Sequence, residues 1–174
     1  FAMPSEPGDI DVHPSGRFLA VVCSNAETVE IDLQSGSSRT LFKEPEPLNT
    51  PNHIKNNGRC SYTTDGTRII RWGITRGTPI WHREREEFII KPDLADAQCS
   101  DLSLTEEVLA LAITSPGENT IYFLDPATGK AITDPLQQSN WTMVSQLDGS
   151  GTRLLTGGHD NNAQVWHWDT RKPL

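Results

Sequence analysis

The chain has 174 residues, a mass of 19.3 kDa and a formal net charge of −8. This length suits one domain or part of a larger one. The acidic balance argues against nonspecific binding of DNA or RNA, which needs a basic face. No segment approaches the ~18 apolar residues of a membrane span.

The two remaining compositional signals concern location. The first four residues, Phe-Ala-Met-Pro, have neither the basic nor the apolar region of a signal peptide. Cys23, Cys60 and Cys99 lie far apart, so they fit reduced thiols better than disulfides or a zinc site. We therefore expect a cytoplasmic protein without membrane or nucleic-acid partners.

Short apolar runs separated by turn residues follow one another along the chain. In chain order, strands are expected at residues 10–12, 18–23, 69–74, 87–90 and 108–113. Residues 101–112 include the best helical candidate. However, the continuous apolar run from Val108 to Ile113, bounded by Glu107 and by Ser115-Pro116, favours a buried strand. The sequence therefore predicts an all-β protein.

The predicted strands recur as a repeat. Turn positions at Gly16, Gly66, Glu106 and Gly151 serve as anchors, with spacings of 50, 40 and 45 residues. Apolar residues stand four before and three after each anchor, and the pairs are Val12 and Leu19, Tyr62 and Ile69, Leu102 and Leu109, and Leu147 and Leu154. The residues fifteen after the anchors are Ile31, Trp81, Ile121 and Trp166. These positions align without gaps.

Four units follow from this alignment, at approximately residues 9–43, 58–91, 98–135 and 141–174. Each unit is read as a strand, a Gly turn, a strand, an Asp or Asn turn, a third strand, a loop and a fourth strand. One such antiparallel sheet cannot cover its own apolar faces. Stacked copies bury those faces against one another.

The last unit carries the clearest family signature. A turn aspartate, Asp160, is followed by Val165 and Trp166, and the third unit has Leu124-Asp125 where the family has Trp-Asp. These features resemble the WD-repeat β-propeller family, especially the long bacterial repeat arrays. The resemblance implies a β-propeller of four-stranded antiparallel blades, with about four blades in this chain.

Some family positions are altered. The family pairs a histidine ahead of the first strand with the turn aspartate. Here His53 holds that place in the second unit opposite Thr75, and Asp160 stands opposite Gln138. We interpret His53, Asp160, Trp81 and Trp166 as structural repeat positions.

Four blades are fewer than the seven or eight usual in the family. The chain starts at a first strand, and the last unit lacks room for an outer strand, so we expect a partial propeller or one completed by a second chain. The latter includes a homodimer. Sheet edges and apolar blade faces would otherwise be exposed.

The resemblance implies a rigid platform for protein or peptide partners, and we expect a non-catalytic interaction scaffold that binds through rim loops. The candidate contact residues are Trp141, Asn140 and Asn57, since Trp is enriched at binding hot spots. The charged segment 82–87 is read as a solvated hairpin tip, with a docking role as the alternative. No catalytic or metal-ligating residues and no cofactor are assigned.

Two alternatives stay open. In the first, the chain is a metal-assisted hydrolase of the propeller type, and Asp9, Asp11, Asp101 and His53 would have to converge. In the second, it is a half-propeller module whose role is self-assembly. That reading predicts that residues 172–174 meet residues 9–14 across a chain boundary.

Overall fold

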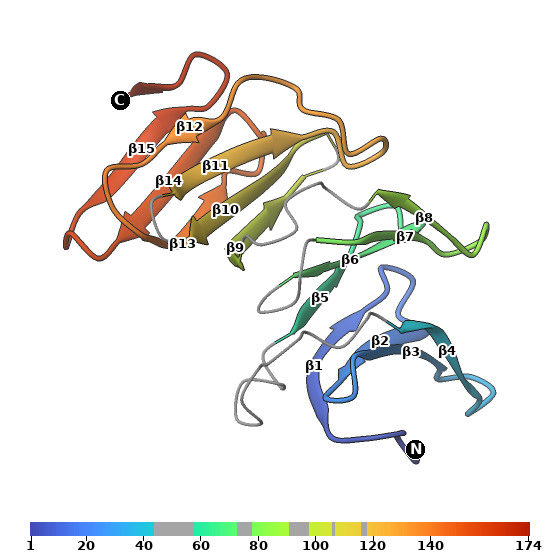
Figure 1. Cartoon of the computed structure of the whole chain (residues 1–174). Helices are drawn as coiled ribbons and strands as arrows, with labels where there is room; N and C mark the ends of the chain where they lie inside the picture. Colours follow the sequence, from blue (N-terminus) through green and yellow to red (C-terminus); the bar gives the residue numbers. More distant parts are fainter. Residues whose placement is uncertain (44–57, 73–77, 91–97, 106, 116–117) are drawn as a thin grey trace. The chain divides into compact units, whose positions relative to one another are not determined.

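The fold consists of four antiparallel four-stranded sheets (Figure 1). The computed structural model describes residues 1–43, 58–72, 78–90, 98–105, 107–115 and 118–174. All regular elements in these ranges are strands, which confirms the all-β prediction. The described residues contain no helix that is long and apolar enough to cross a membrane.

The chain divides into two compact units, residues 1–93 and 94–174, and each contains two sheets. Each sheet is called a blade and numbered in chain order. Blade 1 contains β1 (Pro7–Val12), β2 (Phe18–Cys23), β3 (Glu27–Asp32) and β4 (Ser38–Lys43). Blade 2 contains β5 (Arg59–Tyr62), β6 (Arg68–Trp72), β7 (Ile80–His82) and β8 (Glu87–Ile90).

The second unit holds the other two blades. Blade 3 contains β9 (Gln98–Leu104), β10 (Leu109–Ser115), β11 (Glu118–Leu124) and β12 (Leu136–Gln137). Blade 4 contains β13 (Thr142–Leu147), β14 (Arg153–Gly158), β15 (Ala163–His167) and β16 (Lys172–Pro173). Within every blade the strands pair in chain order, as consecutive hairpins require.

The first turn of blades 1, 2 and 4 contains a left-handed residue. Gly16, Gly66 and Gly151 have φ of 71°, 69° and 67°, which glycine adopts without steric cost. The register that follows matches the repeat, because Val12 pairs with Leu19, Tyr62 with Ile69 and Leu147 with Leu154.

Blade 3 departs from the gap-free alignment. Leu109 pairs with Leu104, and not with Leu102 as the alignment required. The cause is a shorter turn: the closing hydrogen bond runs from Thr105 N to Val108 O, whereas blade 1 closes from His13 N to Phe18 O.

The third strand of blade 3 is also shifted. Leu109 pairs with Leu124, so Leu124-Asp125 holds the place of Ile31-Asp32, and Ile121 pairs with Ala112 instead. The position fifteen after the anchor was therefore wrong for this blade. The three extra residues between the paired Leu109 and Leu124 belong to longer strands, because β10 and β11 pair as far as Ser115–Glu118.

A second correction concerns the end of blade 4. The expectation that its outer strand is missing was wrong, because β16 pairs with β15 through Trp166–Pro173 and His167–Lys172. This strand has two residues. Such a short strand blunts an exposed edge while adding little pairing.

In the second unit the two blades are joined by an apolar cluster. Ala110, Ala112, Ile121 and Phe123 of blade 3 pack against blade 4 with buried partners that include Leu154. We call this contact the 3–4 junction. Trp168, which follows β15, stacks on Phe123 with ring centroids 5.2 Å apart.

In the first unit the two blades are joined by both apolar and polar contacts, which we call the 1–2 junction. Ala20 and Val22 pack on Cys60, Tyr62 and Ile69. The remaining contacts involve charged side chains and form the candidate site.

Candidate functional site

A buried glutamate lies at the centre of the 1–2 junction. Glu30 stands between Val29 and Ile31 in β3, and alternation turns its side chain toward blade 2, where it is 3% exposed. The Tyr62 hydroxyl donates to Glu30 Oε1 at 3.2 Å, and Arg83 Nε donates to the same oxygen. A buried carboxylate needs such partners, because an unpaired charge is costly to desolvate.

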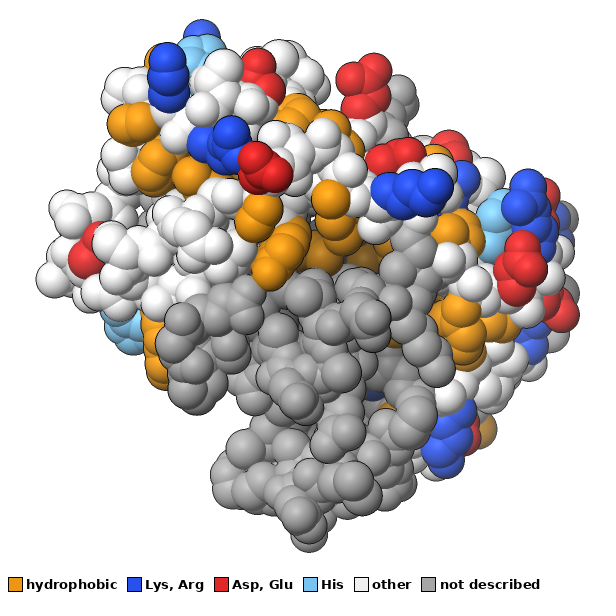
Figure 2. Space-filling view, turned by 45° about the horizontal axis from the view of Figure 1, so that its top comes forward, with side chains coloured by type: hydrophobic (Ala, Val, Ile, Leu, Met, Phe, Trp, Pro, Cys, Tyr) orange, Lys and Arg blue, Asp and Glu red, His pale blue; other side chains and the backbone are white. Residues whose placement is uncertain are grey.

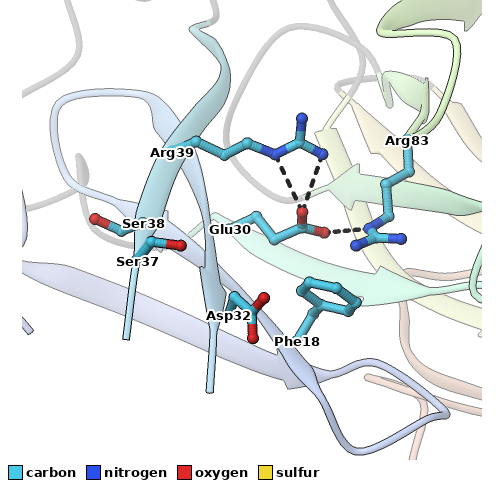
Figure 3. A pocket seen from close by; sticks show the side chains of 7 residues that line it. All are labelled: Phe18, Glu30, Asp32, Ser37, Ser38, Arg39 and Arg83. Atoms are coloured by element: carbon cyan, nitrogen blue, oxygen red, sulfur yellow. Dashed lines mark hydrogen bonds and ion pairs between the residues drawn. The ribbon is translucent and has the colours of Figure 1, made fainter. Parts of the chain in front are cut away.

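Arg39 satisfies the second oxygen of Glu30. Its Nε and Nη2 donate to Oε2 at 3.2 and 3.1 Å (Figure 3). Its Nη1 donates to Glu86. The nearby carboxylate and the burial of Tyr62 both raise the pKa of the Tyr62 hydroxyl, with burial the larger cause. The phenol thus stays a hydrogen-bond donor at neutral pH.

An aromatic ring supports the arginine. The Arg83 guanidinium lies 3.9 Å from the centroid of the Phe18 ring, in cation–π geometry. Arg17 lies 4.9 Å from the same ring and forms hydrogen bonds of 2.7–3.3 Å with Asp32. The hydrogen bond from Arg17 lowers the pKa of Asp32 well below its usual range.

These side chains surround an open hollow of about 190 Å³. Its walls come from β2, β3, the β3–β4 turn, β4 and the turn after β7 (Figure 3). The lining residues are Phe18, Glu30, Asp32, Ser37, Ser38, Arg39 and Arg83. The hollow can offer guanidinium and hydroxyl donors beside one aromatic ring.

Trp141 marks a second place, in blade 4. Its side chain is 50% exposed just before β13, and its ring meets the His159 ring edge-on at 5.7 Å. Asn140 Oδ1 accepts the Trp141 N–H at 2.8 Å, and Trp141 O accepts the His159 N–H at 3.1 Å. A Cβ at Gly158 would lie 2.6 Å from Trp141 O, so only glycine permits this approach.

The repeat tryptophans lie in the blades. Trp81 is buried between Phe42 and Phe88, at centroid distances of 5.3 and 5.0 Å. Trp166 is half-buried and its Nε1 donates to Thr156 Oγ1 at 3.0 Å.

The remaining assigned residues are turn residues or lie outside the described ranges. Asp160 is exposed, and its Oδ1 accepts the Asn162 N–H at 3.1 Å, as a turn aspartate does. His53 and Asn57 lie outside the described residues.

Two aspartates of the hydrolase alternative have structural partners. Asp9 Oδ2 accepts the Cys60 N–H at 2.9 Å, and Asp11 Oδ2 accepts the Tyr62 N–H at 2.6 Å and the Ser61 hydroxyl at 3.0 Å. They thus bond the backbone of β5. Among the described residues no three His, Cys, Asp or Glu side chains are grouped to hold a metal ion.

The hollow was missed by sequence reasoning. Arg83 was placed in a solvated hairpin tip, but its side chain is only 16% exposed. The available signal was Glu30, a charged residue inside the apolar strand β3. Its partner Arg83 lies 53 residues away, and nothing local to either residue indicates their pairing.

Charges on the surface are mixed. On the face shown in Figure 2, Lys and Arg side chains lie beside Asp and Glu side chains. The net charge of −8 is therefore not gathered into one acidic surface on that face.

Comparison with known proteins supports the fold. No family model and no curated protein matches the chain. Among solved structures, it is similar to a chain of a mitotic checkpoint complex, with 20% identity and a TM-score of 0.69 over 94% of this chain and 48% of that chain. It is also similar to dihydro-heme d1 dehydrogenase NirN, with 14% identity and a TM-score of 0.74 over 100% of this chain and 37% of that one.

A third similar structure has almost the same length. The computationally designed Ika4 protein aligns with 11% identity and a TM-score of 0.71, over 96% of this chain and 94% of that chain. The chain spans less than half the length of the two natural chains it matches. At these identities the likeness shows the fold alone: the chain is built of β-propeller blades.

Proposed function

We propose that the chain is a non-catalytic protein-interaction scaffold of the WD-repeat type that binds a protein or peptide partner through the loops at one rim. The single observation that carries this proposal is the exposed, fixed Trp141. Its backbone N–H and C=O are both bonded, and its ring contacts His159. A large aromatic side chain held in place in this way loses little conformational entropy when a partner covers it.

Selection from a displayed peptide library on the immobilised full chain tests this proposal. We expect selected peptides to bind Trp141→Ala at least ten-fold more weakly than the wild-type chain. Leu33→Ala is the matched control, because Leu33 is an exposed apolar residue of blade 1 and should leave binding unchanged. Failure to select peptides, or equal binding to Trp141→Ala, would reject the proposal.

A second role, self-assembly into a homodimer, is favoured by one face of blade 4. Inside the chain, the pairs Ala110–Phe123 and Ala112–Ile121 form the face of blade 3 that packs on blade 4. The corresponding pair in blade 4 is Leu155–Val165, on strands at the same place in the repeat. Leu155 is 44% exposed, whereas Ala110 at the equivalent position of blade 3 is buried against the next blade.

Blade 1 exposes the face that, in blade 4, is buried against the preceding blade. Ile10 and Val12 are exposed on β1, at the places where Ser145 and Leu147 are buried on β13. The occupant we propose is a second copy of the chain, whose blade 1 would cover Leu155. The packing would repeat that of the 3–4 junction.

Light scattering after size exclusion, over a dilution series, tests this role. We expect a mass near twice 19.3 kDa for the wild-type chain, and the monomer mass for Leu155→Glu. Leu33→Glu is the control, since Leu33 has the same 44% exposure as Leu155. A wild-type chain that is monomeric at every concentration would exclude self-assembly.

The free thiols support the proposed location. Cys23 and Cys60 are buried free cysteines, and burial raises the pKa of the Cys60 thiol to about 12. Thiols of this kind persist in a reducing compartment. We propose the cytoplasm on this ground, and labelling of both thiols only after unfolding is the measurement that checks their reduced state.

A further inference from the structure

We propose that the hollow in the first unit binds one acidic side chain of a partner peptide on the outer edge of Arg83. The ligand chemistry is an oxyanion, either the carboxylate of Asp or Glu or the phosphoryl group of a phosphorylated residue. This inference rests on the proposed peptide-binding function and names the kind of residue recognised.

The first argument is an unused set of donors. A guanidinium has five N–H donors, and Glu30 takes only the one on Arg83 Nε. Within the described part of the chain, no acceptor is bonded to the two terminal nitrogens of Arg83. Figure 3 shows these nitrogens beside the Phe18 ring at the hollow.

The second argument is preorganisation. The contacts with Glu30 and with the Phe18 ring fix Arg83 from two sides. An arginine held by its Nε keeps its two-nitrogen edge free, and that edge matches the two oxygens of a carboxylate or phosphoryl group. Little side-chain entropy is then lost on binding.

The third argument is charge. Glu30 is paired with both Arg39 and Arg83, and Asp32 is paired with Arg17. The carboxylates that line the hollow are therefore already neutralised, whereas the edge of Arg83 is not. Ser37 lies across the hollow, and its hydroxyl points to the side of Glu30 and Arg83, where it can donate to the same anion (Figure 3).

The carboxylate of Glu86 can compete with a ligand anion at the hollow. Glu86 is paired with Arg39 but is 62% exposed, so this pair contributes little stability and can open. Its carboxylate is bonded to Arg39 Nη1, and Arg39 lines the hollow. Its removal should therefore strengthen anion binding.

Nuclear magnetic resonance of the full chain tests the inference through the Arg83 Nε–H signal and the amides of Ser37 and Ser38. The probes are three capped peptides of five residues, whose central residue is phosphoserine, glutamate or serine in glycine and alanine flanks. We expect the first two peptides to shift these signals and the serine peptide to leave them unchanged. The ratio of the two affinities tells which oxyanion is preferred.

Three variants make the result specific. Arg83→Lys keeps the charge beside Glu30 but loses the two-nitrogen edge, and we expect at least ten-fold weaker binding. Arg85→Lys is the matched control on the same turn, because Arg85 is 70% exposed and outside the hollow. Glu86→Gln should bind two- to five-fold more tightly, which gives a readout that does not depend on the folding of Arg83→Lys.

Shifts spread evenly over the chain, or equal binding by Arg83→Lys and Arg85→Lys, would overturn the inference. If Trp141-dependent peptides bind while acidic peptides do not, this inference fails and the proposed function stands. If acidic peptides bind at Arg83 but no Trp141-dependent peptide is selected, the hollow stands and the role of Trp141 is rejected.

Discussion

The side chains that the structure describes at the two junctions differ in chemistry. The 3–4 junction is an apolar cluster around Phe123 and Leu154, both fully buried. The 1–2 junction adds Asp9, Asp11 and Glu30, which bond the backbone or side chains of blade 2. Directional hydrogen bonds from charged side chains therefore add to apolar packing at the 1–2 junction, and they leave donors of Arg83 free for a ligand.

The largest expected effect is in the apolar junction. Phe123→Ala should lower the free energy of unfolding by about 3–5 kcal/mol, because it removes a buried ring and leaves a cavity. Urea unfolding followed by tryptophan fluorescence measures this loss. A loss below about 1 kcal/mol would show that the cluster does not hold blades 3 and 4 together.

The polar junction should respond to loss of its central charge. Glu30→Met is expected to cost about 3 kcal/mol, because it leaves Arg83 and Tyr62 without their acceptor. The double variant Glu30→Met with Arg83→Met should cost less than Glu30→Met alone, since the uncompensated charge is gone. Urea unfolding of both variants checks the order, and a more costly double variant would contradict it.

A pair of equivalent glycines isolates a third contact of the polar junction. A Cβ at Gly66 would lie 2.1 Å from His13 Nε2, whereas a Cβ at Gly16 has open space. Both residues have a left-handed φ, so alanine costs about 1–2 kcal/mol at either place. Gly66→Ala should cost about 1–3 kcal/mol more than Gly16→Ala, because His13 must move.

Thermal unfolding compares the two glycine variants. Equal losses would mean that the contact of His13 with blade 2 adds no stability.

Acid should lower the stability of both units, because each has a turn aspartate with a lowered pKa. Burial raises the pKa of Asp65, but hydrogen bonds from Thr63 and Thr67 outweigh it and lower the pKa from 3.8 to about 2. A carboxylate with a lowered pKa stabilises the fold above its ordinary value, so this stability is lost as pH falls from about 4 to about 2. In blade 4 the backbone N–H of Arg153 lowers the pKa of Asp148 in the same direction.

Urea unfolding midpoints measured from about pH 5 to about pH 2, the range in which carboxyl groups titrate, test this expectation. Asp65→Asn and Asp148→Asn should each flatten the decline. An unchanged pH profile in Asp65→Asn would contradict the assignment.

The smallest expected effect on stability concerns the turn between the third and fourth strands of each blade. Gly36 and Gly129 have positive φ in blades 1 and 3, and Glu86 and Arg171 adopt φ of 53° and 57° at the same place in blades 2 and 4. Glu86→Gly and Arg171→Gly should each stabilise the fold by about 0.5–1 kcal/mol, since glycine relieves the left-handed strain. A rise in melting temperature checks this, and a fall in both variants would refute it.

Much of the fold could be predicted because its signals are local. The apolar runs at residues 18–23 and 87–90 became strands with the same bounds, and three of the four anchors are left-handed turn glycines. Such signals depend on a few adjacent residues.

The features that the sequence did not predict lack a clear sequence signal. The shorter turn of blade 3 has no glycine to indicate it; Thr105 Oγ1 accepts the Val108 N–H at 3.0 Å instead. The strand β16 is too short to show alternation. The pairing of Glu30 with Arg83 depends on how two blades face each other, which no local pattern records.

The central claim is that carboxylates of blade 1 hold the first strand of blade 2. Hydrogen exchange of the backbone amides in the Asp9→Ala, Asp11→Ala double variant tests it most directly. The account predicts faster exchange of the Cys60 and Tyr62 amides, which donate to these carboxylates, and unchanged exchange in β14. Unchanged exchange at Cys60 and Tyr62 would contradict it.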